Sequence, residues 1–445
     1  MAQRLVVIGG DAAGMTAASQ ARRLDPTLEI IALEKGPYTS YSACGIPYHV
    51  SGDVEPLERL VVRTPQEFRD RQRIDVRILH EVTGIDLDTR RVEVRDHDHG
   101  RSLHLTFDHL LVATGARPLR PDIPGIDLPH VHGVQTLDDG ATLLAFAEQS
   151  ACQRIVVVGA GYIGLEMAEA FARWGAEVTI LEGGPQVMRT LDPDMAALVQ
   201  GAIERHEIEV RTNTLVTGID ASTVQTIDGE VPADLVVLGL GVTPNSDLAA
   251  DAGIVLGERG AIRVDRRQQA NVEGVWAAGD CAESFHLVTR SPIHVALGTV
   301  ANRQARVAGV NLGGGYATFP GVVGTAITRI CSTEIARTGL TEAEARRHGF
   351  GYVTARIEST TRAGYFPGAE PVHVKVLAER RSGRLLGGQI VGGPGSAKRI
   401  DTLATALTAG FTVEQVVDLD LSYAPPFSPV WDPVQTACRV AAGQL

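Results

Sequence analysis

Short runs of β-branched and apolar residues recur along the chain, and several end at a glycine-containing turn. Two stretches share one longer pattern, residues 4–34 ("RLVVIGGDAAGMTAASQARRLDPTLEIIALE") and residues 154–182 ("RIVVVGAGYIGLEMAEAFARWGAEVTILE"). Each predicts a strand, a glycine turn, a helix and a second strand that ends in glutamate. The chain is therefore expected to contain the same βαβ unit twice, which is typical of an α/β fold.

The turn of the second unit carries Gly159, Gly161 and Gly164, and its last strand ends at Glu182. Glycines at this spacing allow a tight turn and let the backbone approach a pyrophosphate, which then lies at the helix N-terminus. The terminal acid can accept hydrogen bonds from a ribose. This unit is predicted to bind a dinucleotide.

The first unit keeps Gly9, Gly14 and the terminal Glu34, but Asp11 stands at the middle glycine position. A carboxylate beside a pyrophosphate is unfavourable, so Asp11 is expected to point away from it or to meet a cation. Because both units have the complete strand, turn, helix, strand and acid order, the chain is predicted to hold two nucleotide cofactors.

Three further apolar segments follow these units. Residues 107–118 ("FDHLLVATGARP") and 233–245 ("ADLVVLGLGVTPN") predict strands that end in Gly and Pro turns, one closing each nucleotide unit. Residues 273–280 ("EGVWAAGD") predict another strand that ends at Asp280. Asp280 is either a ligand for a nucleotide cofactor or the N-cap of a following helix.

The 445-residue chain is too long for one core at about 100–200 residues per domain, so two to four units are expected. Its net charge of −12 argues against a general nucleic-acid-binding protein, because phosphate affinity depends on clustered Lys and Arg. The N-terminus shows no signal-peptide pattern, and no apolar run approaches the roughly 20 residues of a membrane span. A cytoplasmic protein is predicted.

The five cysteines are scattered without metal-type spacing and do not indicate a disulfide framework. Cys44 lies in "SYSACGIPY" (40–48), where Gly45 and Pro47 predict a turn into a helix. A helix N-terminus lowers the pKa of a cysteine, so a reactive thiolate is expected. The position five residues on is His49, so a redox-active Cys44 would form a mixed disulfide with a small thiol or become a sulfenic acid.

Together these motifs resemble the flavoprotein pyridine nucleotide–disulfide oxidoreductase superfamily over essentially the whole chain. The resemblance implies an α/β fold with two Rossmann-like (βαβ) dinucleotide-binding domains and a C-terminal α+β interface or dimerisation domain. The implied domains are an FAD-binding domain (1–112 and 246–320), an NAD(H)-binding domain (113–245) and an interface domain (321–445). The implied FAD contacts are Gly9, Gly14, Glu34, Lys35, Thr114, Gly115 and Asp280.

Within that superfamily, the single-cysteine motif is similar to that of the coenzyme A-disulfide reductases. In that family two tyrosines, in the contexts of Tyr365 ("YFPG") and Tyr423 ("YAPP"), reach the cysteine from the partner subunit of a homodimer. A proton donor is wanted because a thiolate leaves faster when it is protonated in step. The last histidine, His373, lies before the C-terminal tail, so the implied catalytic residues are Cys44, Tyr365 and Tyr423.

The resemblance also implies contacts to the small-molecule substrate at Thr16, Gln20, Arg23 and Ser40. Arg22 and Arg23 offer a local anchor for the phosphates of the coenzyme. Three positions depart from the family pattern: Ala43 stands where an asparagine is usual, Gln72 stands where a lysine is seen, and Trp431 lies near another basic position. Arg71 and Arg73 flank Gln72. These departures put the identity of the disulfide in doubt.

The sequence thus predicts an NAD(P)H-dependent flavoprotein that reduces a low-molecular-weight disulfide, coenzyme A disulfide above all, through FAD and Cys44. Glu182 favours NADH, with NADPH possible, because an acid repels a 2′-phosphate and no basic residue follows before Arg189. Two alternatives stay open: an NADH peroxidase or oxidase with a Cys44 sulfenic acid, or a reductase of a protein electron carrier. Ala12 counts against the first, because related peroxidases have a histidine there.

Two polar segments are interpreted as turns. Residues 95–100 ("RDHDHG") lie between strand-like segments, and no metal site is expected there. Residues 380–384 ("RRSGR") separate two apolar runs and predict a hairpin turn in the sheet of the interface domain.

Overall fold

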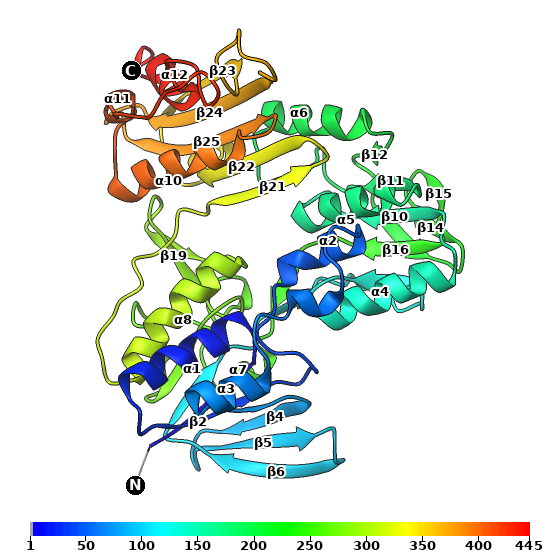
Figure 1. The fold of residues 1–445 in the computed structure, drawn as a ribbon, viewed down its shortest axis with the longest axis vertical. Coiled ribbons are helices and arrows are strands. Elements are labelled where there is room, and N and C mark those ends of the chain that lie inside the picture. Colours follow the sequence, from blue (N-terminus) through cyan, green and yellow to red (C-terminus); the bar gives the residue numbers. More distant parts are fainter. Residues whose placement is uncertain (1–2) are drawn as a thin grey trace.

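The computed structural model describes residues 3–445, which form three bodies, each built around a five-stranded sheet (Figure 1). Two bodies have parallel sheets with helices packed against them, and the third is antiparallel with helices on one side. The predicted α/β fold with two Rossmann-like units and a C-terminal α+β unit is confirmed. Residues 1 and 2, at the start of the predicted FAD domain, lie outside the described residues, and the domain boundaries stay a prediction.

The first body has the parallel strand order β18-β7-β1-β2-β3. Strands β18, β7, β1 and β2 are mainly apolar because both faces of the sheet are covered there, whereas the edge strand β3 has Asp75 and Arg77. Helices α1 and α8 cross so closely that a Cβ on Gly309 would lie 2.5 Å from the carbonyl oxygen of Ala17. The elements are β1 (Arg4–Ile8), α1 (Ala12–Leu24), β2 (Glu29–Leu33), α2 (Ile46–Val50), α3 (Pro65–Gln72), β3 (Asp75–Arg77), β4 (His80–Asp86), β5 (Arg91–Asp96), β6 (Arg101–Thr106), β7 (His109–Val112), α7 (Asp247–Asp251), β18 (Val275–Ala277), β19 (Ser284–His286), β20 (Ser291–Ile293) and α8 (Gly298–Leu312).

The second body repeats this plan, with the parallel strand order β12-β11-β10-β16-β9. Strands β8 and β17 pair antiparallel, so the chain enters and leaves this body through one two-stranded ribbon. The elements are β8 (Ala116–Pro118), β9 (Val131–Gly133), α4 (Leu137–Gln149), β10 (Arg154–Val158), α5 (Tyr162–Arg173), β11 (Glu177–Leu181), α6 (Pro193–Glu204), β12 (Glu209–Arg211), β13 (Val216–Ile219), β14 (Thr223–Thr226), β15 (Gly229–Pro232), β16 (Leu235–Leu238) and β17 (Val242–Pro244).

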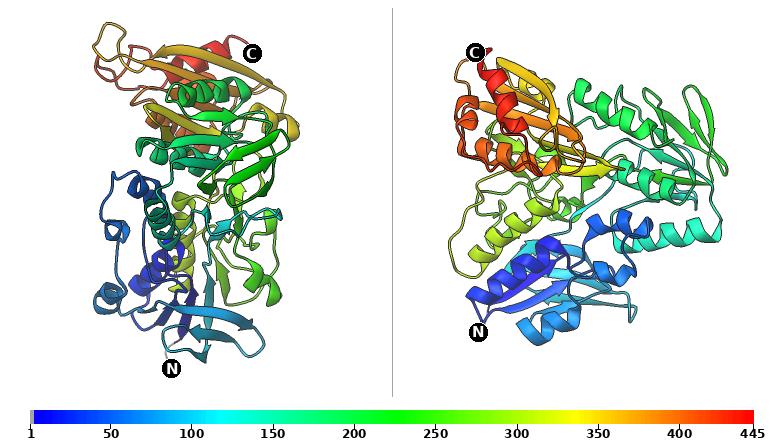
Figure 2. Two further views of the ribbon diagram at one scale, coloured as in Figure 1. Left: turned by 90° about the vertical axis from the view of Figure 1, so that its right-hand side faces the viewer. Right: turned by 45° about the horizontal axis from the view of Figure 1, so that its top comes forward.

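The third body is the antiparallel sheet β21-β22-β25-β24-β23. Residues 380–384 join β24 to β25, which confirms the predicted hairpin turn. Two views in Figure 2 place α12 and the β4–β6 sheet at opposite ends of the molecule. The elements are β21 (Ala326–Ile330), β22 (Thr333–Gly339), α9 (Glu342–Arg347), β23 (Tyr352–Thr360), β24 (Pro371–Glu379), β25 (Leu385–Gly392), α10 (Ile400–Ala409), α11 (Val413–Val417) and α12 (Pro433–Ala442).

Within residues 3–445, none of the helices combines the length and the apolar character that crossing a membrane requires. The cytoplasmic location stays a prediction.

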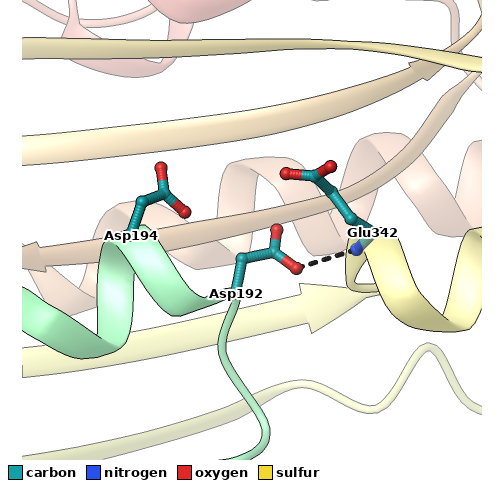
Figure 3. Close-up of side chains that lie close together, drawn as sticks. All are labelled: Asp192, Asp194 and Glu342. Atoms are coloured by element: carbon teal, nitrogen blue, oxygen red, sulfur yellow. Dashed lines mark hydrogen bonds between the residues drawn. The ribbon is translucent and has the colours of Figure 1, made fainter. Parts of the chain in front are cut away.

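A buried ion cluster joins the second and third bodies. Figure 3 shows its three carboxylates, Asp192 and Asp194 at the start of α6 and Glu342 at the start of α9. Lys375 Nζ lies 3.2 Å, 2.7 Å and 2.6 Å from oxygens of these three residues. Burial alone would lower the pKa of Lys375, but its hydrogen bonds to Asp194 and Glu342 outweigh burial and raise the pKa. Because an ammonium group already lies among the carboxylates, we interpret the cluster as a tie between bodies and not as a metal site.

Replacing Lys375 by Met should lower the free energy of unfolding by about 3–5 kcal/mol, the usual cost of removing one partner from a buried charge pair. The carboxylate of Asp192, which is 2% exposed, would be left without its cation. The urea midpoint measures the effect, with Lys398→Met as the control because Lys398 pairs with Asp401 at the surface. Equal midpoints for the two variants would contradict this account of the cluster.

Candidate active site

The two predicted nucleotide units place their terminal acids in the same way. Glu34 accepts hydrogen bonds from the Gly10 N–H (2.7 Å) and the Gly36 N–H (2.8 Å). Glu182 accepts from the Ala160 N–H (3.0 Å) and the Gly184 N–H (2.7 Å). Each acid therefore fixes its glycine turn. A carboxylate has about four acceptor sites, so each also keeps capacity for a ribose hydroxyl.

The glycine turns require glycine for two reasons. Gly9 and Gly159 have φ angles of +108° and +102°, a region that favours glycine. A Cβ on Gly14 or Gly164 would lie 1.9 Å or 2.0 Å from the carbonyl oxygen of the first glycine of its own turn. Both turns therefore hold the bare backbone close to the start of a helix, which suits a pyrophosphate.

Asp280 lies after β18, and no described helix begins directly after it, so the N-cap interpretation is not supported. Its Oδ1 is buried without a hydrogen-bond partner. Burial raises the pKa of Asp280 to about 6, while His294 opposes the shift. A buried acceptor without a donor fits a ligand that carries hydroxyl groups, as the ribityl chain of FAD does. The first unit therefore fits FAD.

The other predicted FAD contacts lie around the glycine turn of the first unit. Thr114 donates a side-chain hydrogen bond to the carbonyl of Asn245, and Gly115 has a φ of +68°. Lys35 is exposed beside Glu34.

Asp11 meets a backbone amide and not a cation. The Tyr41 N–H donates to Asp11 Oδ1 (2.9 Å), and the pKa of Asp11 is raised to about 6, first by burial and then by Glu34 and Asp280. The Ser40 N–H donates to the Gly10 carbonyl (2.9 Å), and the Thr39 hydroxyl donates to the same oxygen. The glycine turn of the first unit thereby fixes the segment that leads to Cys44.

Cys44 lies in a single 3-10 turn, Ala43–Gly45, directly before α2, and Pro47 stands in the first turn of that helix as predicted. Helix α2 packs between α5 and α4 of the second body: a Cβ on Gly140 of α4 would lie 2.6 Å from Ile46 Cγ2. The Cys44 segment therefore lies where the first and second bodies meet.

The expectation of a low pKa for Cys44 is wrong, because the groups of this chain around the thiol raise its pKa. Although Cys44 as a residue is exposed, partial burial of the thiol raises its pKa, and the carboxylates of Glu166 and Asp280 raise it further. Helix α2 has only 5 residues, so its dipole is weak beside these charges. Sequence reasoning could not weigh carboxylates that come from distant segments.

Glu166 is the functional candidate that sequence reasoning missed. It lies on α5 of the second body, and burial raises its pKa. The Thr328 hydroxyl donates to Glu166 Oε1 at 2.6 Å. Glu166 follows Gly164 by two positions in the dinucleotide motif, but nothing in the sequence indicates that α5 would lie against the Cys44 segment.

The two predicted tyrosines lie together on the third body, on the loop after β23 and the loop before α12. Tyr365 is 78% exposed and Tyr423 is 45% exposed. Desolvation raises the pKa of Tyr423, and the neighbouring Tyr365 raises it further. The two tyrosines are thus neighbours on the third body, whereas Cys44 lies between the other two bodies.

Three of the predicted substrate contacts follow one face of α1, since Thr16, Gln20 and Arg23 are spaced by four and three residues. The Thr16 hydroxyl donates to Asn302 Oδ1 on α8 (2.7 Å), and Arg23 Nη1 donates to Gln20 Oε1 (3.3 Å). Ser40 lies on the segment fixed by the glycine turn and has a φ of +49°.

The two neighbouring arginines of α1 have different roles. Arg22 donates to the carbonyls of Gln72 (2.9 Å), Arg73 (3.0 Å) and Pro26 (2.9 Å), so it ties α1 to α3. Arg23 is exposed, and its only side-chain hydrogen bond within residues 3–445 goes to Gln20. Arg23 therefore keeps most of its five N–H donors for a phosphate, whereas Arg22 has only one left.

Two of the departures from the family pattern have neighbouring cations. Arg71, beside Gln72, is exposed and lies 3.8 Å from Glu67. The guanidinium of Arg439 lies 5.0 Å from the ring centre of Trp431, so a cation stands at that position although the residue itself is aromatic.

Comparisons with known proteins agree with this geometry. The family described as pyridine nucleotide-disulphide oxidoreductase matches residues 3–305, and its dimerisation domain matches residues 325–433. The chain is 39% identical over 441 residues to the NAD(P)H sulfur oxidoreductase (CoA-dependent) of Pyrococcus abyssi, covering 98% of this chain and 97% of the relative. It is 31% identical over 427 residues to the coenzyme A disulfide reductase of Staphylococcus epidermidis, covering 96% of each. The structure of an NAD-dependent persulfide reductase from A. fulgidus matches with a TM-score of 0.96 at 40% identity, covering 99% of this chain and 83% of that one.

Two dinucleotide units, each closed by an acid, with a cysteine segment between them, define a class of oxidoreductase that moves electrons between two nucleotides and a thiol. The chain belongs to the pyridine nucleotide-disulphide oxidoreductase family. It is an FAD-dependent NAD(P)H oxidoreductase, as predicted.

Proposed function

We propose that this enzyme reduces coenzyme A disulfide, with Cys44 as the residue that exchanges thiols with the substrate. The observation that carries the proposal is the position of Cys44, on a segment fixed to the first nucleotide unit and packed against the second. The Pyrococcus abyssi relative is a CoA-dependent enzyme, and the Staphylococcus epidermidis relative is a coenzyme A disulfide reductase. Because another relative is a persulfide reductase, coenzyme A persulfide is the second substrate to test.

FAD bound in the first unit supplies two-electron transfer between NAD(P)H and a disulfide. The Cys44 thiolate attacks one sulfur of the substrate, forming a mixed disulfide and releasing the first thiolate. Two electrons from NAD(P)H then cleave the mixed disulfide, which restores the Cys44 thiolate and releases the second thiolate. Each released thiolate takes one proton, so one turnover consumes two electrons and two protons.

We further propose that Tyr365 and Tyr423 of a partner subunit donate these protons in a homodimer. The match to a dimerisation domain supports the homodimer, and the exposure of both hydroxyl-bearing side chains leaves them accessible to a second copy. Thr16, Gln20, Arg23 and Ser40 are proposed to hold the substrate, with Arg23 at a phosphate. We propose that FAD would be held by the contacts predicted from the sequence. The nicotinamide nucleotide would be held by Gly159, Gly161, Gly164 and Glu182.

The proposed function is tested by anaerobic NADH consumption with FAD-loaded protein. Coenzyme A disulfide, coenzyme A persulfide, hydrogen peroxide and then oxygen are offered in turn. Fast turnover with a coenzyme A substrate supports the proposal. Faster turnover with peroxide would make Cys44 a sulfenic-acid centre, and flavin reduction without any turnover would point to a protein acceptor.

Replacing Glu182 by Ser should reduce the preference for NADH over NADPH by about tenfold or more. Like charges brought together at a binding site cost several kcal/mol, and about 1.4 kcal/mol corresponds to tenfold. The ratio of kcat/KM for the two nucleotides measures the effect, and Glu177→Ser, at the exposed start of the same strand, is the control. An unchanged ratio would mean that Glu182 serves only the turn through Ala160 and Gly184.

A further inference from the structure

The two loops that carry the tyrosines, residues 361–370 and 420–432, have no strand or helix of their own. One backbone hydrogen bond joins them directly, from the Ala363 N–H to the Pro425 carbonyl (3.0 Å). The tyrosine side chains are exposed, so packing in a core cannot fix their positions. Other contacts must therefore fix the position of the two loops relative to each other.

Arg399 lies between these loops and contacts both. Its Nη2 donates to the carbonyl of Thr361 (2.7 Å) in the first loop and to the carbonyl of Phe427 (2.7 Å) in the second. Nη1 donates to the carbonyl of Gly395 (2.6 Å), which ties both loops to the segment before α10. One guanidinium therefore satisfies three carbonyls from three segments, and its planar shape fixes their relative positions.

The cation is itself held in place by a counter-charge. Arg399 Nε lies 3.1 Å from Asp432 Oδ2, and the two side chains are only 12% and 15% exposed. Asp432 also accepts from the Val434 N–H (2.8 Å), which makes it the N-cap of α12, and from the Ser428 hydroxyl (3.3 Å). Arg399 and Asp432 together form a clamp on the two loops. Because Asp432 begins α12, and α12 is packed into the core of the third body, the clamp is attached to a rigid part of the fold.

We infer that Arg399 is a positioning residue that holds the loops of Tyr365 and Tyr423 as one block, so that the two side chains are presented together. The inference rests on the proposed function, since it assigns to Arg399 the placement of the proposed proton donors. The role assigned to Arg399 is thus an indirect one, exerted through the tyrosines.

Arg399→Met in the FAD-loaded enzyme should slow disulfide reduction by at least about tenfold, because a misplacement of about 1 Å can cost on the order of 100-fold. Flavin reduction by NADH should keep its native rate in the same stopped-flow experiment. Arg399→Lys should stay slow, since one ammonium cannot reproduce the planar fork. The control is Arg381→Met, an exposed residue of the hairpin turn between β24 and β25.

The decisive comparison combines Arg399→Met with Tyr365→Phe and Tyr423→Phe. If Arg399 acts through the tyrosines, the combined variant should reduce the disulfide at the same rate as the double tyrosine variant. A further tenfold loss of that rate would overturn the inference. A slow tyrosine variant with a fast Arg399→Met would also overturn it, leaving the proposed function intact. A tyrosine variant as fast as the native enzyme would instead remove the proton-donor role, and the inference with it.

Should Arg399→Met fail to fold, Asp432→Asn keeps an N-cap residue for α12 while removing the counter-charge. The same selective loss of disulfide reduction is expected for it. An equal loss of both half-reactions would show that the clamp serves only the fold.

Discussion

Cys44→Ser lowers the turnover of disulfide substrates by on the order of 1,000-fold or more, the scale of loss when an enzyme is deprived of its nucleophile. A serine hydroxyl cannot form a mixed disulfide, so residue 44 would offer no disulfide to accept the two electrons from NAD(P)H. Flavin reduction by NADH should be unaffected, because the residues of both glycine turns are unchanged. Stopped-flow absorbance of the flavin, with and without coenzyme A disulfide, separates the two half-reactions.

Cys152→Ser is the matched control for this variant. Cys152 is partly buried beside the second unit, and its thiol contacts the Asp234 carbonyl at 3.7 Å. Full disulfide turnover is expected from it. If Cys44→Ser kept the native turnover with a protein acceptor, the enzyme would be a carrier reductase in which Cys44 has no redox role.

Replacing both Tyr365 and Tyr423 by Phe should slow disulfide reduction by about 100-fold to 10,000-fold, the usual contribution of a positioned general acid. The ring of each residue remains, so the exposed surface of the third body changes little. The expected loss is confined to the release of thiolate, and the rate of flavin reduction by NADH should stay native. Single variants show whether one hydroxyl of the pair carries most of the effect.

The pH dependence provides a control for the tyrosine variant. With the native enzyme, the disulfide step should slow at high pH as Tyr423 loses its proton, and the raised pKa of Tyr423 moves this loss above the usual tyrosine range. The double variant should lose that alkaline decline. An identical alkaline decline in both enzymes, or equal slowing of flavin reduction, would contradict a proton-donor role.

The parts of the fold and site that the sequence predicts are those encoded locally. The glycine turns and the acids that end the two βαβ units, Glu34 and Glu182, lie where the sequence predicts them, because each acid bonds within its own unit. Their contacts to nucleotides stay predictions. The roles of Glu166, Arg399 and Lys375 depend on segments that meet only in the folded chain. The pKa of Cys44 was mispredicted for the same reason, since the opposing carboxylates come from two other segments.

Arg22 and Arg23 show the same limit on a finer scale. Both are basic residues in the last turn of one helix, and the sequence treats them as one anchor. Their separation of one position turns the first toward α3 and leaves the second exposed. The sequence shows that the helix carries two basic residues, but only the packing decides which of the two side chains bonds within the fold.

The Cys44 segment has one attachment on each nucleotide unit. Its first end is bonded to the glycine turn through Tyr41, and α2 at its other end is packed on the second body, where Arg173 also donates to Asp53 at 2.7 Å. Because the segment is attached to both units, the position of the Cys44 sulfur depends on how the two units are placed relative to each other.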